Sequence, residues 1–198
     1  SAPDPGRLQF TYVGAETNSP TLTGFYMRKA VDTTQTSIQA FNSGTDWIEL
    51  RFAEVLMNLA EAANEIGNTA EGYTEIAALR ARAGIDAGAD NLYGLKPGMS
   101  KTEMRNAILD ERLIEFAFES KRYWDLRRWR LYESEFNGTR RTGLRTTLKP
   151  GVTKDQVNSL TRSELEANYA TYFNQEVITL DTQFPINWRP EYYFFAIP

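Results

Sequence analysis

The sequence of 198 residues contains no cysteine and no histidine. Their absence excludes zinc sites with cysteine or histidine ligands, thiol nucleophiles and every catalytic arrangement that pairs serine or cysteine with histidine. It also excludes a disulfide scaffold. No apolar run approaches the roughly 20 residues that a membrane-spanning helix requires. Any chemistry of this chain must therefore come from carboxylates, basic side chains, hydroxyls, amides and aromatic rings.

Composition and net charge place the chain among folded proteins without an overall basic surface. Apolar residues make up 41% of the sequence, and 198 residues suffice for one domain with a hydrophobic core. The stretch from Lys121 to Lys149 carries nine basic and three acidic residues, and its interleaved aromatic rings could stack on nucleic-acid bases. That stretch has a net charge of +6 within a chain of net charge −4, so the rest carries −10 and we expect no nucleic-acid partner.

Apolar residues spaced by three and four predict two helices joined by a short turn. The first helix is expected over residues 46–66, with Asp46 and Glu49 as its capping box. The second is expected over residues 69–84, with Thr69 as its cap. Two antiparallel helices with so short a connection form a helical hairpin.

Further elements follow this hairpin. Glycines and a proline predict a loop over residues 86–99, and Ser100 with Glu103 forms a capping box that opens a helix to about residue 120. The remaining expectations are a helix over residues 123–132, an exposed loop over 137–151, a helix from Thr161 to about Phe173, and strands or extended segments at 177–180 and 192–197.

Together these elements predict a mainly α fold, built from α-helical hairpins with loops and a few short C-terminal strands. Residues 1–44 are rich in Thr, Ser, Gly, Pro and Asn and are expected to be a loop-rich or extended segment. Residues 45–198 are expected to form the helical domain. No strict 34-residue repeat is present, so periodicity alone does not indicate a tetratricopeptide array.

The segment from Glu111 to Trp129 concentrates acids, arginines and aromatic residues. Side chains three or four positions apart share a helix face, so these acids and arginines can neutralise one another. A planar guanidinium holds a carboxylate at two points and also stacks on tryptophan. We predict a structural ion-pair network that comprises Glu111, Arg112, Glu115, Glu119, Arg122, Asp125 and Arg128.

The sequence supports a catalytic or metal-binding role of the carboxylates less well than it supports the structural ion-pair network. Glu111 and Glu115 could be a carboxylate pair for glycoside hydrolysis, but nearby arginines oppose the raised pKa that a general acid needs. A di-metal helical bundle would use Glu-x-x-His motifs, which this chain cannot supply. Calcium could bind oxygens of Asp86, Asp90 or Asn91, although their spacing does not match an EF-hand. We predict no catalytic residue, no metal site and no cofactor.

The same segment resembles the signature of the SusD/RagB family of nutrient-binding outer-membrane lipoproteins. That signature is roughly Glu-Arg-x-x-Glu-x-x-x-Glu-Gly-x-Arg-x-x-Asp-Leu-x-Arg-Trp, and Ser120 stands where the family usually has glycine. Residues 50–62 resemble a second family block, with Phe52 in place of the common tyrosine, and residues 78–85 resemble a third. The signature matches at Glu111, Arg112, Glu115, Glu119, Arg122, Asp125, Leu126, Arg128 and Trp129.

The resemblance implies a tetratricopeptide-like superhelix in the C-terminal portion of a longer, non-enzymatic protein. It implies a surface-exposed outer-membrane lipoprotein of a Bacteroidetes-type bacterium, which binds nutrient oligosaccharides or starch-like polysaccharides. The partner would be a SusC-like TonB-dependent porin, and the membrane would be reached only through an N-terminal lipid anchor absent from this chain.

The ligand-binding residues are not implied by the resemblance, because the family's signature blocks are scaffold. Exposed tyrosine and tryptophan rings are common platforms for sugars. We therefore predict ligand contacts from the aromatic residues expected in loops: Tyr12, Tyr26, Tyr93 and Trp188. Two alternatives remain open: a helical-repeat module that binds a protein or a peptide cargo without sugar affinity, and a glycan-processing enzyme.

Overall fold

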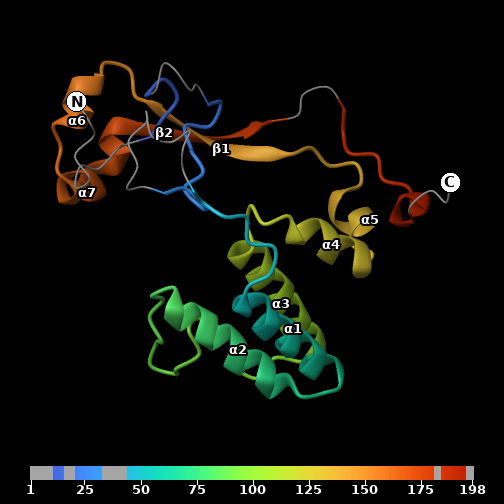
Figure 1. Cartoon of the computed structure of the whole chain (residues 1–198). Helices are drawn as coiled ribbons and strands as arrows, with labels where there is room; N and C mark the ends of the chain where they lie inside the picture. The colour runs from blue at the N-terminus through green and yellow to red at the C-terminus, as the bar shows by residue number, and fades with distance from the viewer. Residues whose placement is uncertain (1–10, 16–20, 33–43, 181–183, 195–198) are drawn as a thin grey trace. The chain divides into compact units, whose positions relative to one another are not determined.

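The computed structural model of the chain describes residues 11–15, 21–32, 44–180 and 184–194 (Figure 1). The chain divides into two compact units. We call Trp47–Tyr132 the helical unit, and Ser1–Asp46 together with Glu133–Pro198 the sheet unit. Among the described residues, no helix combines the length and the apolar character needed to cross a membrane. The predicted division into residues 1–44 and 45–198 stays a prediction.

The helical unit begins with the predicted helical hairpin. Helix α1 (Phe52–Glu65) and helix α2 (Thr69–Arg82) are joined by a turn in which Gly67 adopts a φ of +95°, a conformation that favours glycine. The predicted capping box of Asp46 and Glu49 is wrong. Glu49 accepts a hydrogen bond from Trp47 Nε1 through its side chain and one from Lys121 Nζ through its carbonyl, and the helix begins later, after Arg51.

The start of α2 also differs from its prediction in detail. Asn68, rather than Thr69, is the residue before the first helical turn. The Thr69 hydroxyl instead donates to Asn64 Oδ1 at 3.2 Å, and Asn64 Nδ2 donates to the carbonyl of Lys101 at 2.9 Å. These contacts tie the hairpin turn to the start of the next helix.

Helix α3 (Lys101–Glu115) opens with the predicted capping box: Ser100 accepts from the backbone N–H of Glu103, whose side chain accepts from the backbone N–H of Ser100. The helix ends at Glu115 rather than near residue 120. Phe118 and Ser120 adopt positive φ values of +66° and +61°, which interrupts the helix before α4 (Lys121–Arg128) begins. Ser120, which stands where the family signature has glycine, therefore occupies a left-handed conformation.

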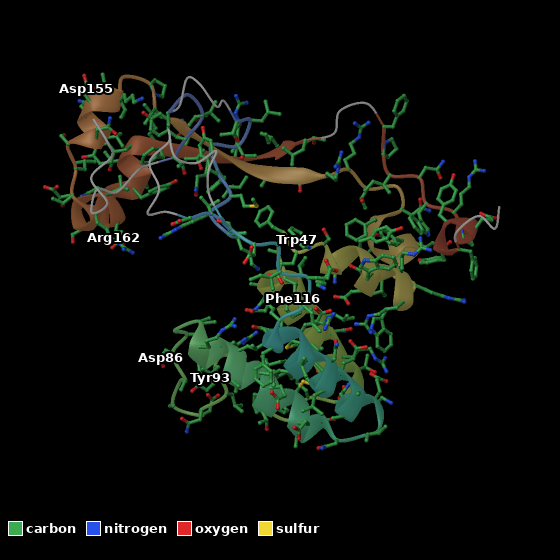
Figure 2. The ribbon with its side chains drawn as sticks, viewed as in Figure 1. Trp47, Asp86, Tyr93, Phe116, Asp155 and Arg162 are labelled. Atoms are coloured by element: carbon green, nitrogen blue, oxygen red, sulfur yellow. The ribbon has the colours of Figure 1, made fainter. Side chains whose placement is uncertain are left out.

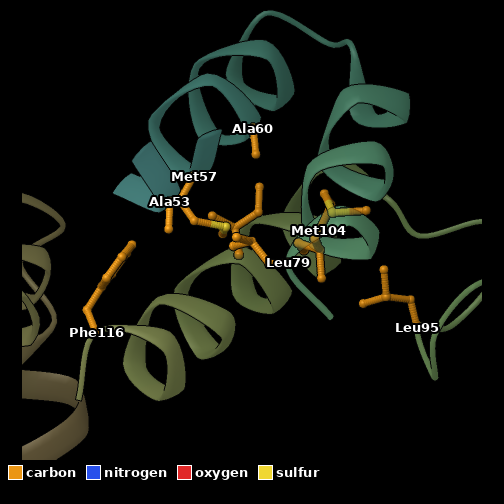
Figure 3. Close-up of a cluster of buried hydrophobic side chains, with 9 residues drawn as sticks. Ala53, Met57, Ala60, Leu79, Leu95, Met104 and Phe116 are labelled. Carbon is orange, nitrogen blue, oxygen red and sulfur yellow. The ribbon is translucent and has the colours of Figure 1, made fainter. Parts of the chain in front are cut away.

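The three longer helices of this unit enclose one hydrophobic core (Figure 3). Gly72 lies where α2 meets α3, and a Cβ atom at this position would be only 2.7 Å from Met104 Sδ. A glycine therefore lets these two helices approach each other closely. The buried core consists of Ala53, Met57, Ala60, Ile76, Leu79, Leu95, Met104, Ile108 and Phe116.

The sheet unit contains a two-stranded antiparallel sheet, so the fold is mainly helical with a little strand, as predicted. Strand β1 (Thr142–Leu148) pairs with β2 (Phe173–Thr179), in a register that places Thr142 opposite Thr179. The predicted exposed loop over residues 137–151 is wrong because it contains β1. Two helices, α6 (Lys154–Asn158) and α7 (Arg162–Tyr172), connect the strands.

The structure tests three further predictions for this unit. The helix capped by Thr161 and Glu164 is confirmed, and the predicted strand at 177–180 is confirmed in β2. The described part of the predicted segment 192–197 is not a strand: Pro190–Tyr193 form a short 3-10 helix, η2. Proline fixes φ at a helical value and suits the first helical position, which explains the turn. Residues 195–197 lie outside the described residues.

The described segments 11–15 and 21–32 contact the sheet through backbone hydrogen bonds. Val13 N donates to the Thr146 carbonyl at 2.9 Å, and Thr146 N donates to the Thr23 carbonyl at 2.8 Å. A second core forms around these contacts. It consists of Tyr12, Ala15, Val157, Leu165 and Phe173. Helix α5 (Tyr132–Phe136) lies at the boundary between the two units in the sequence.

Candidate functional site

The most buried ion pair of the helical unit joins α3 to α4. Arg112 Nε donates to Asp125 Oδ2 at 2.9 Å, and the two side chains are only 5% and 2% exposed. Asp125 also accepts from Arg128 at 3.0 Å, and Arg112 Nη1 donates to Asn58 Oδ1 at 2.9 Å. Arg128 in turn pairs with Glu61 of α1. These contacts link α1, α3 and α4 through charged groups whose hydrogen bonds are satisfied.

A second arginine, Arg51, lies immediately before α1 and clamps the end of α3. Its Nε and Nη2 donate to the two carboxylate oxygens of Glu119 at 2.8 and 2.9 Å. Its Nη1 donates to Glu115 Oε1 at 2.5 Å, and Nη2 also donates to the Glu115 carbonyl at 2.8 Å. One guanidinium therefore holds two carboxylates and one of the last carbonyls of a helix.

Helix α2 contributes the remaining partners. Arg80 Nε donates to Glu111 Oε2 at 2.8 Å, and Arg82 pairs with Glu115. Both arginines belong to the third of the blocks that resemble the SusD/RagB family. Arg51 and Glu61 belong to the second. The ion pairs therefore connect all three blocks, and we call this set of contacts the ion-pair junction.

Most of the residues that pair in the ion-pair junction lie far apart in the sequence. Of the pairs proposed from three-residue spacing, Asp125 with Arg128 forms. Arg122 has no such contact among the described residues: its Nε and Nη1 atoms are buried without a hydrogen-bond partner. Sequence reasoning missed Arg51, Glu61, Arg80 and Arg82 as partners. These four residues belong to the other two blocks that resemble the family, and that sequence signal could have identified them.

The electrostatics of the ion-pair junction oppose acid catalysis. Burial by itself would raise the pKa of Glu115, but hydrogen bonds from Arg82 and Arg51 hold that pKa below its ordinary value. Glu111 is fixed against Arg80. A carboxyl with a lowered pKa is ionised at neutral pH and cannot act as the proton donor that glycoside cleavage requires. The geometry is that of a scaffold.

The pKa of Glu75 in α2 shifts in the opposite direction to that of Glu115, because burial and the neighbouring Glu71 raise it. We expect Glu75→Gln to stabilise the protein by about 1 kcal/mol at pH 7, since it removes a buried charge of the same sign as Glu71. A raised folded-state pKa destabilises the wild type above that pKa, and the penalty fades as the pH falls towards the ordinary Glu value of about 4.3.

Thermal melts of both proteins between pH 5 and pH 7.5 test this expectation. The advantage of Glu75→Gln should be largest at the upper end and should shrink as the pH is lowered. Glu71→Gln is the control, because it relieves the same repulsion from the less buried partner. An advantage that is constant with pH would show that Glu75 does not titrate in this way.

The loop between α2 and α3 carries Asp86 and Tyr93 (Figure 2). Asp86 Oδ1 accepts from Gly88 N at 2.7 Å, and Asp90 Oδ1 accepts from Leu92 N at 3.0 Å, so both carboxylates stabilise turns of the loop. The Tyr93 carbonyl accepts from Arg80 Nη1 at 2.8 Å. Among the described residues, no group of three or more acidic side chains is arranged to hold a metal ion.

The four aromatic residues predicted to bind ligand are divided between the two units. Tyr93 lies in the helical unit, whereas Tyr12, Tyr26 and Trp188 lie in the sheet unit. Tyr12 is only 3% exposed and its ring packs against Phe173 at 5.8 Å, so it has no open ring face for a sugar. Tyr26 is exposed. The ligand role of these residues stays a prediction.

Trp188 lies in a group of aromatic rings that we call the Trp188 cluster. Its ring meets Tyr192 edge-on at 5.6 Å and Tyr193 at 5.1 Å. The backbone N–H of Trp188 donates to Asn137 Oδ1 at 3.0 Å, which fixes the segment beside the chain that precedes β1. Tyr192 is 49% exposed, so this cluster presents aromatic surface to solvent next to an amide side chain. Aromatic faces beside polar groups suit sugar rings.

The sequence of this chain is similar to those of known proteins. A model of the SusD family matches residues 6–198. The SusD-like protein P2 of Formosa agariphila is 40% identical over 95 residues, which cover 48% of this chain and 19% of that protein. The SusD-like protein P25 of the same organism is 33% identical over 118 residues, which cover 60% of this chain and 21% of that protein.

A solved structure supports the fold. A SusD-like protein of Bacteroides fragilis superposes with a TM-score of 0.61 and 26% identity, over 88% of this chain and 27% of that chain. The matched segments of 95 and 118 residues span about a fifth of the length of each of the two curated relatives.

Proposed function

The chain belongs to the SusD family, and we propose that the protein containing it captures nutrient glycans at the cell surface without cleaving them. The family match over residues 6–198 is the observation that carries this proposal. Proteins of the SusD family are non-catalytic binding proteins. The ion-pair junction agrees with this, because the carboxylates of the signature segment are held by arginines and are not arranged to cleave a glycosidic bond.

The cellular setting is part of the same proposal. The protein would be an outer-membrane surface lipoprotein, and it would deliver oligosaccharides to a SusC-like TonB-dependent transporter. A lipid anchor would attach it to the membrane. Family membership supports each of these statements.

Within this chain, the Trp188 cluster is the place that we assign to sugar contact. Its rings can cover the apolar C–H face of a sugar, and the neighbouring Asn137 offers polar atoms for hydroxyl groups. Two backbone hydrogen bonds hold the chain just before Trp188: Gly138 N donates to the Ile186 carbonyl, and Ile186 N donates to the Thr139 carbonyl, each at 2.8 Å. A rigid platform lowers the entropy lost on binding.

Isothermal titration calorimetry of the complete protein against plant, host and microbial glycans tests the proposed function. We expect saturable binding to at least one glycan class, with no hydrolysis products detected by chromatography. Heat of binding to peptides alone would favour the peptide-cargo alternative, and product formation would contradict a capture role.

We expect Tyr192→Ala to weaken the binding of that glycan by about tenfold, which corresponds to about 1.4 kcal/mol from one lost aromatic contact. Phe25→Ala is the matched control, because it removes an exposed aromatic ring of the sheet unit that is outside the Trp188 cluster and is not one of the predicted ligand contacts. If both variants bind like the wild type while the glycan still binds, the Trp188 cluster is not the contact site.

A further inference from the structure

Helix α4 divides its side chains between two faces. One face belongs to the scaffold: Asp125 and Arg128 take part in the ion-pair junction, and Leu126 between them is only 3% exposed. Trp124 and Arg127 are three positions apart, so they are neighbours on the helix surface. Neither of them belongs to the ion-pair junction. This second face is therefore not what holds α1, α3 and α4 together.

The second face carries exposed aromatic rings. Trp124 is 52% exposed and Tyr123 is 41% exposed. Their rings meet edge-on with centroids 5.2 Å apart, and the ring of Tyr132 lies 5.9 Å from that of Tyr123. An exposed indole ring is a suitable platform for the apolar C–H face of a sugar.

Arg127 is positioned beside this platform by Tyr123. Its guanidinium lies over the Tyr123 ring, 5.5 Å from the centroid, and its Nη1 donates to the Tyr123 hydroxyl at 3.0 Å. Stacking uses the flat face of a guanidinium, whereas an anion is bound through the N–H groups at its edge. The orientation of Arg127 is therefore fixed in advance, which lowers the entropy lost when it binds an anion.

Arg130 follows the last turn of α4 and adopts a left-handed conformation with a φ of +54°. Its N–H donates to the Arg127 carbonyl at 3.1 Å, and the N–H of Leu131 donates to the Leu126 carbonyl at 2.8 Å. Helices that end in this way usually have glycine at the left-handed position, because a side chain there costs conformational energy.

No contact within the described part of the chain offsets this cost. Arg130 is exposed, and its side chain forms no hydrogen bond or ion pair with any described residue. Residues in costly backbone conformations often serve a function rather than the fold. The side chain of Arg130 therefore suits a ligand. We call Tyr123, Trp124, Arg127 and Arg130 the α4 outer face.

The α4 outer face has the chemistry that an acidic sugar requires. Trp124, Arg127 and Arg130 follow one another at intervals of three residues, so an aromatic platform and two cations lie in sequence along the helix. Arginine binds a carboxylate or a sulfate through paired N–H groups. A neutral sugar would use the platform but not the two charges. A nucleic-acid strand would need a wider basic surface than a chain with a net charge of −4 offers.

We propose that the α4 outer face binds an acidic residue of a glycan, one that carries a carboxylate or a sulfate. Trp124 contacts the sugar ring, and Arg127 and Arg130 hold the acidic group. This inference rests on the proposed function and names the class of glycan that the protein captures. It adds a contact site in the helical unit to the Trp188 cluster of the sheet unit.

Isothermal titration calorimetry of the complete protein tests the inference with two matched pairs of glycans. The first pair is oligogalacturonate and the same oligosaccharide with its carboxylates methyl-esterified. The second is a sulfated galactan oligosaccharide and its desulfated form. In at least one pair, the charged member should bind about tenfold more tightly than the neutral one, and the pair that shows this identifies the acidic group. High salt should reduce the difference, because Arg130 is exposed.

Arg130→Gly separates binding from folding. It removes the guanidinium and also relieves the left-handed conformation, so the melting temperature should stay the same or rise. We expect about a tenfold loss of affinity for the charged glycan and no change for its neutral partner. Trp124→Ala should weaken the same charged glycan by removing the platform. Arg28→Ala is the control, because it removes an exposed arginine of the sheet unit.

The possible failures are distinguishable. Equal affinities within both pairs, or an unchanged affinity of Arg130→Gly for the charged glycan, would overturn the inference. Binding of neutral glycans alone would overturn it as well, but would leave the proposed function intact. Absence of binding to every glycan in the panel would contradict both.

Discussion

Replacing Asp125 with alanine is expected to lower the free energy of unfolding by about 3–5 kcal/mol, the usual loss when one member of a buried ion pair is removed. Asp125 accepts hydrogen bonds from Arg112 and Arg128, and its side chain is 2% exposed. Without this carboxylate, the buried Arg112 guanidinium retains only Asn58 as its side-chain acceptor among the described contacts. The positive charge of Arg112 is then buried without a carboxylate partner.

Chemical denaturation monitored by tryptophan fluorescence measures this loss. Asp110→Ala is the matched control, because Asp110 is an exposed aspartate on α3, and surface substitutions usually change stability by less than about 0.5 kcal/mol. A second comparison uses Arg122→Met, which should cost much less than Arg112→Met because the Nε and Nη1 atoms of Arg122 already lack partners. Equal losses for Asp125→Ala and Asp110→Ala would contradict the structural role of the pair.

Gly24→Ala is expected to destabilise the sheet unit by about 2–4 kcal/mol. Gly24 adopts a φ of +86°, and a Cβ atom added to it would lie 2.6 Å from Tyr12 Cα and 2.8 Å from Val13 N. Both neighbours are backbone atoms, which cannot rotate away as the end of a side chain can. The substitution should therefore separate the segments that carry Tyr12 and Thr23 from the sheet.

Gly14→Ala isolates the contribution of backbone conformation. Gly14 has a similar φ of +93°, but an added Cβ would meet nothing within 4 Å. We expect this variant to lose about 1 kcal/mol, from the left-handed conformation alone. Melting curves of both variants decide the matter, and equal losses would show that the close approach of Gly24 to Tyr12 does not contribute.

The parts of the fold that sequence reasoning captured are those encoded locally. The capping boxes of Ser100 with Glu103 and of Thr161 with Glu164 were predicted because each needs only two residues three positions apart. Helix α6 was missed, although Thr153 and Gln156 form the same kind of capping box. The signal was present there, but five residues are too few to show apolar periodicity.

The parts that were missed depend on partners far away in the sequence. Strand β1 was predicted to be a loop because its partner, β2, begins at Phe173, after two helices, and its Gly143 is unfavourable in a strand. The ion-pair junction shows the same limit. Its acids were recognised, but Arg51 contacts Glu119 across 68 positions of sequence, which no local pattern reveals.

The ligand residues were the least predictable feature. Tyr12 and Trp188 both lie in segments with many turn-forming residues, so both were expected to be accessible. In the structure, Tyr12 lies in the core of the sheet unit, whereas Trp188 lies beside the exposed Tyr192. Burial of an aromatic ring is decided by tertiary packing, and composition cannot separate the two cases.

The central claim is that the three family blocks of this chain form one structural scaffold through ion pairs. A double-mutant cycle between Arg51 and Glu119 tests it most directly, because these residues come from different blocks and contact each other through two hydrogen bonds of 2.8 and 2.9 Å. The measured quantity is the free energy of unfolding of the wild type, Arg51→Ala, Glu119→Ala and the double variant. We expect a coupling energy of about 1–3 kcal/mol. Additive losses, with no coupling, would contradict the claim.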